Sequence, residues 1–308
     1  MTNTCVTNFS ELDVRFRDLP RRPRVAVVNP ADDETRHVVT RCLNNGLAQF
    51  DLVVLDGDAD TAEFVEDLRR RYPEAVSVAV AADLDDAARR GVACVRREGA
   101  DVLFKGNINT DKLLRAVLNK EDGLLPPGHV ISHVTAVDQP DYGKLLLFSD
   151  AAVIPQPTRD QFEAMVGYDV AVARKLGIDR PRVALIHFSE KVNPKFQNTL
   201  DYEYLIGRAA DGAFGPMYIA GPMDAKTACD AHSAMVKGIV SDVCGQADIL
   251  IFPDLQAGNT FYKTISLVGH ARMAGMVTGT TAPVVVPSRA DSTESKFYSL
   301  ALACITAI

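Results

Sequence analysis

A serine and an arginine near the C-terminal end of the chain have the chemistry to act together on an anionic substrate. Ser288 and Arg289 directly follow residues 284–286, a short apolar run that is typical of a buried strand. A helical pattern begins near Asp291, so both side chains lie where a strand ends and a helix begins. Such junctions often bind ligands in α/β folds, because a helix N-terminus offers free N–H groups and partial positive charge. A guanidinium can also hold a phosphate through two hydrogen bonds.

The same segment has a purely structural interpretation. Asp291 would then be the N-cap of the helix, Glu294 would complete a capping box, and Arg289 would lie on the surface. This window by itself supports the two interpretations equally.

Three further junctions share the design of a strand, a loop of small or polar residues, and a helix. They are residues 105–110 (K-G-N-I-N-T), 221–224 (G-P-M-D) and 253–259 (P-D-L-Q-A-G-N). Each can direct backbone N–H groups at an anion, and Lys105 adds a full positive charge. Thr110 and Asn259 either contact phosphate or only cap their helices. With four such junctions, we expect two domains to face one anionic ligand across a cleft.

Other polar residues also carry two interpretations. His133 lies in a strand-like run, where a histidine is more often a hydrogen-bonded core residue than a catalyst. Asp150 follows a strand and either caps a turn or orients a residue of the cleft. Glu190 and Lys191 are expected to begin a surface turn, with a contact in the cleft as the less favoured alternative.

The sequence lacks the motifs of several common enzyme classes. It contains no G-x-x-x-x-G-K-[ST], no G-x-G-x-x-G after the first strand, and no G-x-S-x-G. The six cysteines are scattered without a C-x-x-C pair, and the six histidines lack metal-binding spacing. We therefore expect free thiols and no metal site.

Composition narrows the class of protein further. The chain of 308 residues is long enough for two domains with real cores. Its formal net charge of -7 argues against nucleic acid as a partner. No apolar run approaches membrane-spanning length, and the N-terminus lacks the regions of a signal peptide. We expect a cytoplasmic protein that does not bind membranes.

The elements that must position these residues follow an alternating order. Short β-branched runs at 24–28, 52–55, 76–80 and 102–104 alternate with amphipathic stretches. This rhythm predicts an α/β fold with a mostly parallel sheet covered by helices. Later helices are expected at 228–243 and 260–274, with a turn at 276–279. We predict one α/β domain from residues 1–148 plus 276–308, and a second from residues 149–275.

Seven segments, in order along the chain, match the pattern of a known family. They are residues 105–110, 132–137, 148–155, 190–194, 221–224, 252–259 and 288–292. With this order and spacing from about Arg24 to the C-terminus, the chain resembles the phosphate acetyl/butyryltransferase family. S-R-A-D-S followed by S-K-F-Y-S-L-A is similar to the butyryltransferase branch, since acetyltransferases usually carry S-R-G-C-S.

The resemblance implies the reversible reaction of acyl-CoA and inorganic phosphate to acyl phosphate and CoA. Transfer would be direct, in a ternary complex, with CoA as a substrate and no cofactor. The implied architecture is two α/β/α domains with an interdomain cleft, related to isocitrate and isopropylmalate dehydrogenases, in a homo-oligomer. The implied catalytic residues are Ser288 and Arg289, and we add Asp291 as a third. The implied phosphate or CoA contacts are Lys105, Asn109, Thr110, His133, Asp150, Asp254, Gly258 and Asn259.

The chain departs from the acetyltransferase pattern at one position. Ser295 stands where those enzymes place an aspartate, seven residues after the motif serine. Asp291 or Glu294 could substitute as the general base, with a slight preference for Asp291.

Alternative functions are a phosphate acetyltransferase, an NAD-dependent decarboxylating dehydrogenase of related architecture, and a binding protein without catalysis.

Overall fold

The computed structural model describes residues 4–288 and 291–308, which form two compact units. The terminal unit consists of Leu12–Val130 and Ala274–Ile308, and the central unit of residues up to Glu11 and Ile131–Met273. The predicted division differs at the residues up to Glu11 and at 131–148, which group with the central unit, and at 274–275, which group with the terminal unit. For 131–148 the reason is strand pairing, because β5 (Ser132–Asp138) pairs with β6 (Leu146–Ser149), and β6 pairs with β9 (Ile249–Ile251).

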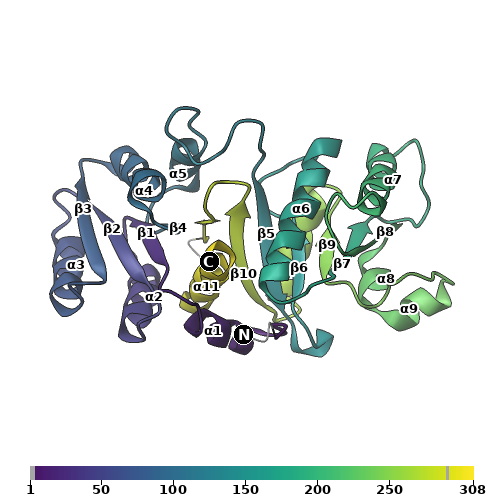
Figure 1. Cartoon of the computed structure of the whole chain (residues 1–308), viewed down its shortest axis with the longest axis horizontal. Helices are drawn as coiled ribbons and strands as arrows, with labels where there is room; N and C mark the ends of the chain where they lie inside the picture. The colour runs from purple at the N-terminus through teal and green to yellow at the C-terminus, as the bar shows by residue number, and fades with distance from the viewer. Residues whose placement is uncertain (1–3, 289–290) are drawn as a thin grey trace. The chain divides into compact units, whose positions relative to one another are not determined.

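In the terminal unit the strands are ordered β3-β2-β1-β4-β11-β10. All neighbouring pairs are parallel except β10–β11, which is antiparallel. Figure 1 shows α4 and α5 on one side of these strands and α2, α3 and α11 on the other. The strands are β1 (Arg24–Val28), β2 (Gln49–Leu55), β3 (Val76–Ala81), β4 (Val102–Lys105), β10 (Arg272–Thr278) and β11 (Val284–Val285). The helices are α1 (Phe9–Arg17), α2 (Asp33–Asn44), α3 (Ala59–Arg71), α4 (Leu84–Glu98), α5 (Thr110–Val117) and α11 (Thr293–Ala307); α1 and β10 include residues of both units.

Aspartate caps set the starts of three helices in this unit. Asp32, Asp58 and Asp83 each accept a hydrogen bond from the backbone N–H three residues ahead. A carboxylate at this position satisfies an otherwise unpaired N–H group and complements the positive end of the helix dipole. The caps therefore fix where the chain turns from a strand loop into a helix.

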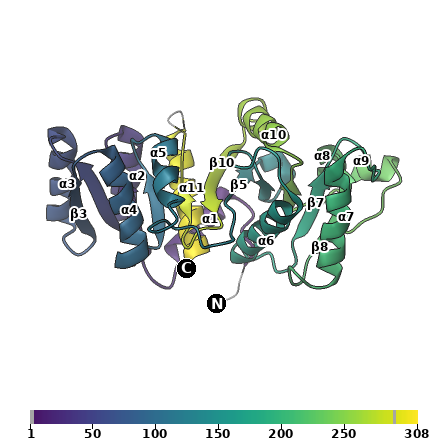
Figure 2. The same cartoon turned by 90° about the horizontal axis from the view of Figure 1, so that it is seen from above.

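The central unit has the strand order β5-β6-β9-β7-β8, with β7 (Arg182–Ile186) and β8 (Tyr218–Met223). Only β5 is antiparallel to its neighbour β6. In Figure 2, α6 and α7 lie on one side of the strands, and α8, α9 and α10 lie on the other. The helices are α6 (Arg159–Lys175), α7 (Gln197–Ala210), α8 (Ala225–Cys229), α9 (Ala231–Val236) and α10 (Leu255–Leu267), with a 3-10 turn at Pro140–Tyr142. The predicted α/β fold with mostly parallel strands is confirmed.

Three predicted elements are wrong. The helix expected at 228–243 is broken into α8 and α9, because the Asp230 side chain accepts from the backbone N–H groups of His232 and Ser233 and starts a new helix. The helix expected at 260–274 ends at Leu267, and the expected turn at 276–279 is mostly strand β10, which pairs with β11 through Val277. Among the described residues, no helix combines the length and apolar composition needed to cross a bilayer.

Candidate functional site

Three loops of the terminal unit leave its sheet at one edge. Strands β1, β4 and β11 are parallel neighbours, so the loops that follow them emerge together at their carboxyl ends. The chain runs from β1 outward to β2 and β3, then returns to β4 on the other side of β1. Such a reversal of strand order is the usual ligand-binding position of open α/β sheets.

A cavity of about 320 Å³ lies at this edge. Its lining comes from all three loops, the first turn of α2 and α11: Ala31, Asp32, Asp33, Glu34, Lys105, Gly106, Asn107, Pro287, Ser288 and Lys296. Ser288 is exposed, whereas Lys105 and Lys296 are each only 4% exposed. Buried ammonium groups are rare in proteins, because desolvation disfavours an isolated charge. The cavity thus combines a hydroxyl group with two buried cations.

The loop after β4 is held tightly against the end of β1. A Cβ atom on Gly106 would lie 2.3 Å from the backbone oxygen of Asn29, so only glycine fits there. The N–H groups of Gly106 and Asn107 donate to the carbonyl oxygens of Val28 and Asn29 at 3.0 and 2.7 Å. These N–H groups are therefore already used, contrary to the prediction that they point at an anion. The Lys105 ammonium, which donates to the Pro287 carbonyl oxygen at 3.2 Å, is the cationic group of this loop.

The start of α5 also differs from the sequence prediction. Asn109 is the N-cap, and its backbone oxygen accepts from the N–H groups of Lys112 and Leu113 at 3.1 and 3.2 Å. Thr110 is the first helical residue and is not the N-cap. Its hydroxyl is therefore not committed to the capping role that the sequence also allowed.

The loop after β11 forms a small turn around Ser288. The Ser288 N–H donates to the Asp291 carboxylate at 2.8 Å, and the Asp291 N–H donates back to the Ser288 carbonyl oxygen at 3.2 Å. Ser292 is the N-cap of α11, since its hydroxyl accepts from the Ser295 N–H at 3.2 Å. The capping role considered for Asp291 is therefore wrong. Arg289 lies outside the described residues.

Asp150 is a structural centre of the central unit. Its carboxylate, 1% exposed, accepts four hydrogen bonds, at 2.7–2.9 Å. The donors are the Ser132 hydroxyl and the backbone N–H groups of His133, Ala152 and Val153. These bonds tie the start of β5 to the loop after β6. His133 is buried beside them, with Nδ1 3.2 Å from the Thr135 hydroxyl.

The first turns of α10 pack directly on this loop. The Asp254 carboxylate caps α10 by accepting from the Ala257 N–H at 2.8 Å. Asn259 lies inside the helix and donates from Nδ2 to the Ala151 carbonyl oxygen at 2.9 Å, so it is not the cap. Gly258 lies against the Asp150 backbone. Of the predicted site residues at the start of α10, Gly258 thus contacts Asp150 itself, and Asn259 contacts the next residue, Ala151.

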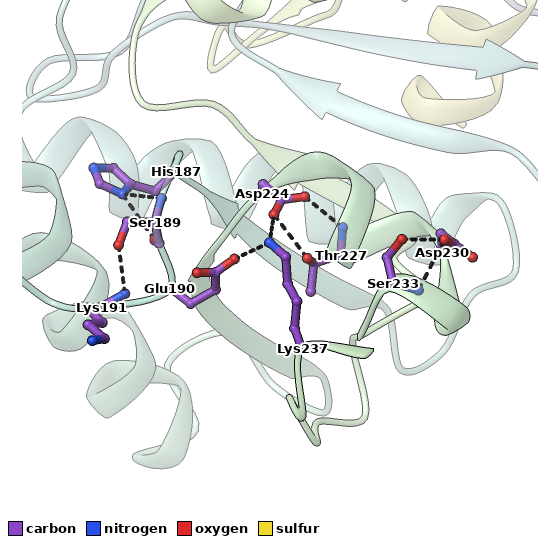
Figure 3. A network of polar contacts seen from close by, with 9 residues as sticks. All are labelled: His187, Ser189, Glu190, Lys191, Asp224, Thr227, Asp230, Ser233 and Lys237. Carbon is purple, nitrogen blue, oxygen red and sulfur yellow. Dashed lines mark hydrogen bonds and ion pairs between the residues drawn. The ribbon is translucent and has the colours of Figure 1, made fainter. Parts of the chain in front are cut away.

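A lysine joins the loops that follow β7 and β8, as Figure 3 shows. The Lys237 ammonium contacts the carboxylates of both Glu190 and Asp224. Asp224 also caps α8 through the Thr227 N–H at 2.8 Å. Burial raises the pKa of Asp224, but hydrogen bonds from Lys237 and Thr227 outweigh burial and lower this pKa to about 2. Glu190 and Lys191 lie in an exposed turn.

Comparison with known proteins identifies the family. The sequence pattern described as phosphate acetyl/butaryl transferase matches residues 24–304. The chain belongs to this family. A phosphate butyryltransferase of Clostridium beijerinckii is 35% identical over 303 residues, covering 97% of this chain and 98% of the relative. A phosphate acetyltransferase of Thermotoga maritima is 35% identical over 223 residues, covering 72% and 76%.

Solved structures agree with the family assignment and with the fold. A branched-chain phosphotransacylase from Enterococcus faecalis V583 has a TM-score of 0.78 and 29% identity, covering 92% of this chain and 99% of that one. A protein described as a 4-hydroxythreonine-4-phosphate dehydrogenase from Salmonella typhimurium has a TM-score of 0.57 at 12% identity, covering 93% and 100%. This second likeness shows the fold alone, and it agrees with the predicted dehydrogenase-like architecture.

The residues predicted from the family pattern form two groups. In the terminal unit, Lys105 and Ser288 line one cavity, with Asn109 and Thr110 at the end of the same β4 loop and Asp291 hydrogen-bonded to Ser288. In the central unit, Asp150, His133, Asp254, Gly258 and Asn259 gather around the start of α10. That the two groups bind one ligand stays a prediction. Within the described ranges, no three His, Cys, Asp or Glu side chains gather in a metal-binding arrangement.

Sequence reasoning missed Lys296, which lines the same cavity as Ser288. Its ammonium lies 2.6 Å from the Asp32 carboxylate and 3.6 Å from that of Glu34. Burial raises the pKa of Asp32, but hydrogen bonds from Lys296 and Thr35 outweigh burial and place it below its usual range. The available signal was a single lysine before an apolar helical run, Phe297–Ile305, which is wholly buried.

Proposed function

We propose that the protein exchanges an acyl group between CoA and inorganic phosphate, with butyryl-CoA or a similar short-chain thioester as its substrate. The observation that carries the proposal is the cavity of the terminal unit, in a chain that belongs to this transferase family. There, the Ser288 hydroxyl opens to the same space as the ammonium groups of Lys105 and Lys296. This set of donors and charges suits a phosphate anion beside a thioester carbonyl.

The reaction proceeds by direct transfer. A phosphate oxygen attacks the thioester carbon, and negative charge develops on the carbonyl oxygen. The Ser288 hydroxyl donates to this oxyanion, a contact that typically contributes about 3 kcal/mol to the transition state. The C–S bond then breaks, leaving acyl phosphate and CoA thiolate, which takes up a proton. In the reverse direction the CoA thiol must lose that proton to a base.

Two neighbours of Ser288 complete the proposed catalytic set. Arg289 holds phosphate through two hydrogen bonds and aligns its oxygen with the thioester carbon. Asp291 is the proposed general base, and its hydrogen bond from the Ser288 N–H supports this by placing the carboxylate beside the hydroxyl. Asn109 and Thr110 are proposed phosphate or CoA contacts in the terminal unit. In the central unit, His133, Asp150, Asp254, Gly258 and Asn259 are proposed to bind or to shape the CoA site.

The test is the release of thiol from butyryl-CoA with and without inorganic phosphate. We expect release to depend on phosphate and to yield one acyl phosphate per thiol. Arg289→Ala should raise the KM for phosphate strongly, with the thermal unfolding midpoint unchanged. Thiol release that ignores phosphate would contradict the proposed reaction, and an unchanged phosphate KM would remove Arg289 from the site.

Acetyl-CoA is the alternative substrate, and the relative from Thermotoga maritima, named a phosphate acetyltransferase, favours it. The relative from Clostridium beijerinckii, named a phosphate butyryltransferase, matches far more of the chain and favours butyryl-CoA. The ratio of kcat/KM for the two thioesters decides between them. One methylene in an apolar pocket changes this ratio by roughly 10–200-fold, so the preference should be clear.

The setting of the reaction is also part of the proposal. We infer a cytoplasmic enzyme, since CoA esters are cytoplasmic metabolites and all six cysteines are free thiols. We further infer a homo-oligomer that needs no cofactor, no membrane and no nucleic acid. Light scattering on the eluting protein checks the oligomer, and activity after exhaustive dialysis against a chelator checks the cofactor.

A further inference from the structure

Lys296 occupies an unusual position for a lysine. It is the fourth residue of α11, is 4% exposed, and is followed by the buried residues 297–305. A lysine usually leaves such a helix to reach water, because burying its charge without compensation costs several kcal/mol. Its ammonium here remains within the terminal unit and faces the cavity of Ser288 and Lys105.

The partners of Lys296 leave part of its hydrogen-bonding capacity unused. The ammonium makes one hydrogen bond in the described part of the chain, to Asp32 at 2.6 Å. Glu34, at 3.6 Å, contributes charge without a hydrogen bond. Asp32 itself is fixed as the cap of α2, because it also accepts from the Thr35 N–H and hydroxyl at 3.0 and 2.8 Å. An ammonium has three N–H donors, so two are not used by residues 4–288 and 291–308 and can reach a molecule in the cavity.

The charges around the cavity indicate what that molecule is. Asp32, Asp33 and Glu34 line the cavity and would repel an anion, whereas Lys296 lies against two of these three carboxylates. Lys105 supplies a second buried cation. A compact dianion can accept hydrogen bonds from both ammonium groups and from the Ser288 hydroxyl, whereas an apolar acyl chain gains nothing from them.

We propose that Lys296 binds the phosphate substrate, and that Asp32 and Glu34 hold its ammonium in position. This inference rests on the proposed acyltransferase function and adds a residue that contacts the transferred phosphate. Lys296 links the start of α2 to α11, the helix that follows the loop carrying Ser288. A change at Lys296 should therefore affect phosphate more than CoA.

The experiment compares three variants by steady-state kinetics at varied phosphate and varied butyryl-CoA. Lys296→Met removes the cation, Asp32→Asn breaks the ion pair but keeps the cation, and Lys112→Met is the control. Lys112 pairs with Asp85 at 2.6 Å in the same unit but does not line the cavity. The thermal unfolding midpoint of each variant separates binding from folding.

We expect Lys296→Met to raise the phosphate KM about tenfold to a hundredfold, the effect of one charge-assisted hydrogen bond, with the butyryl-CoA KM unchanged. Asp32→Asn should lower the unfolding midpoint and raise the phosphate KM less. Lys112→Met should match the wild type in both KM values. If Lys296→Met does not fold, Lys296→Gln replaces it with the same expected change.

Two results would overturn the inference while the proposed function stands. One is a wild-type phosphate KM in Lys296→Met, and the other is an equal rise in Lys296→Met and Asp32→Asn, which would show a structural ion pair only. Absence of phosphate-dependent thiol release in the wild type would instead reject the proposed function itself.

Discussion

The backbone oxygen of Asp150 occupies the space where a side chain on Gly258 would begin, since a Cβ atom there would lie only 2.1 Å away. The obstructing atom is backbone, and the Asp150 carboxylate is fixed by four hydrogen bonds. Neither side of the contact can therefore adjust easily. The glycine allows the first turns of α10 to pack directly on the loop after β6.

Gly258→Ala should consequently destabilise the protein and disturb the loop that Asp150 organises. We expect a loss of about 1–3 kcal/mol in the free energy of unfolding, the usual cost of forcing extra volume into a packed site. Urea denaturation measures this loss. Gly167→Ala is the control, because Gly167 lies within α6 and a Cβ atom on it would meet nothing within 4 Å. That variant should gain about 0.5–1 kcal/mol from helix propensity, and an equal loss in both variants would refute the packing argument.

The buried carboxyl group of Asp169 should give the protein an unusual pH dependence of stability. Its carboxylate oxygens are buried in α6 and have no hydrogen-bond partner in the described part of the chain. Burial, supported by the charge of Asp150, raises the Asp169 pKa well above its usual value. The nearby Ser149 hydroxyl offsets this only partly, because it donates its hydrogen bond to the His133 carbonyl oxygen. The folded protein therefore holds a proton that the unfolded chain releases near pH 4. The contribution of Asp169 to the free energy of unfolding is complete below that pH. It is lost as the pH rises toward the pKa that Asp169 has in the folded protein.

Asp169→Asn should remove this decline, because an amide keeps the shape of the side chain but does not ionise. We expect the variant to be more stable than the wild type at pH 7, with the difference growing by up to about 1.4 kcal/mol per pH unit above pH 4. Urea denaturation from pH 4 to pH 8 measures the difference. A difference that stays constant over this range would show that Asp169 does not titrate as argued.

Sequence patterns predicted β1 to β4 well, because buried parallel strands appear as short β-branched runs between amphipathic helices. Strand β10 was missed, since its residues were expected to form the end of a helix and a turn. Residues 24–28 and 102–104 lie within or coincide with β1 and β4. The grouping of residues 131–148 with the central unit could not be predicted from such local patterns. It depends on β6 pairing with β9, some hundred residues later in the chain, and pairing partners leave no local signal.

The candidate site was partly predictable for a related reason. Lys105 and Ser288 stand at strand ends, where polar residues are conspicuous in the sequence. Lys296 and Asp32 are 264 positions apart, and the local sequence around each is that of an ordinary helical lysine and an ordinary cap. At the start of α11, Asp291 and Ser292 are both suitable caps, and only the hydrogen bond from Ser295 to Ser292 distinguishes them.

The bridge that Lys237 forms between Glu190 and Asp224 predicts a second pH dependence of stability, opposite in sign to that of Asp169. The Asp224 pKa lies at about 2, so its contribution to stability is present above the unfolded pKa near 4 and is lost as the pH falls toward 2. Lys237→Met should remove part of this contribution. The Lys237 side chain is 41% exposed, so solvent screening keeps the expected loss small.

Unfolding by urea at pH 3 and pH 6 tests this bridge. The loss in Lys237→Met should be larger at pH 6 than at pH 3, and should shrink when salt is added. Lys191→Met is the control, since Lys191 is exposed in the neighbouring turn. Equal losses for the two lysines would indicate a general charge effect rather than the bridge to Glu190 and Asp224.

Ser288 and Ser292 are four residues apart and have different expected roles. The Ser292 hydroxyl is committed to capping α11, whereas Ser288 lines the cavity with its backbone held by Asp291. Ser288→Ala should lower kcat by about 10²–10³-fold, the effect of removing one oxyanion donor, while the free energy of unfolding stays unchanged. Ser292→Ala should cost about 1 kcal/mol of stability, the usual loss of an N-cap, with a far smaller effect on kcat. Turnover of butyryl-CoA with phosphate, measured beside urea denaturation of both variants, makes the comparison. Equal losses of kcat in both would place the defect in the fold of this loop and not in the Ser288 hydroxyl.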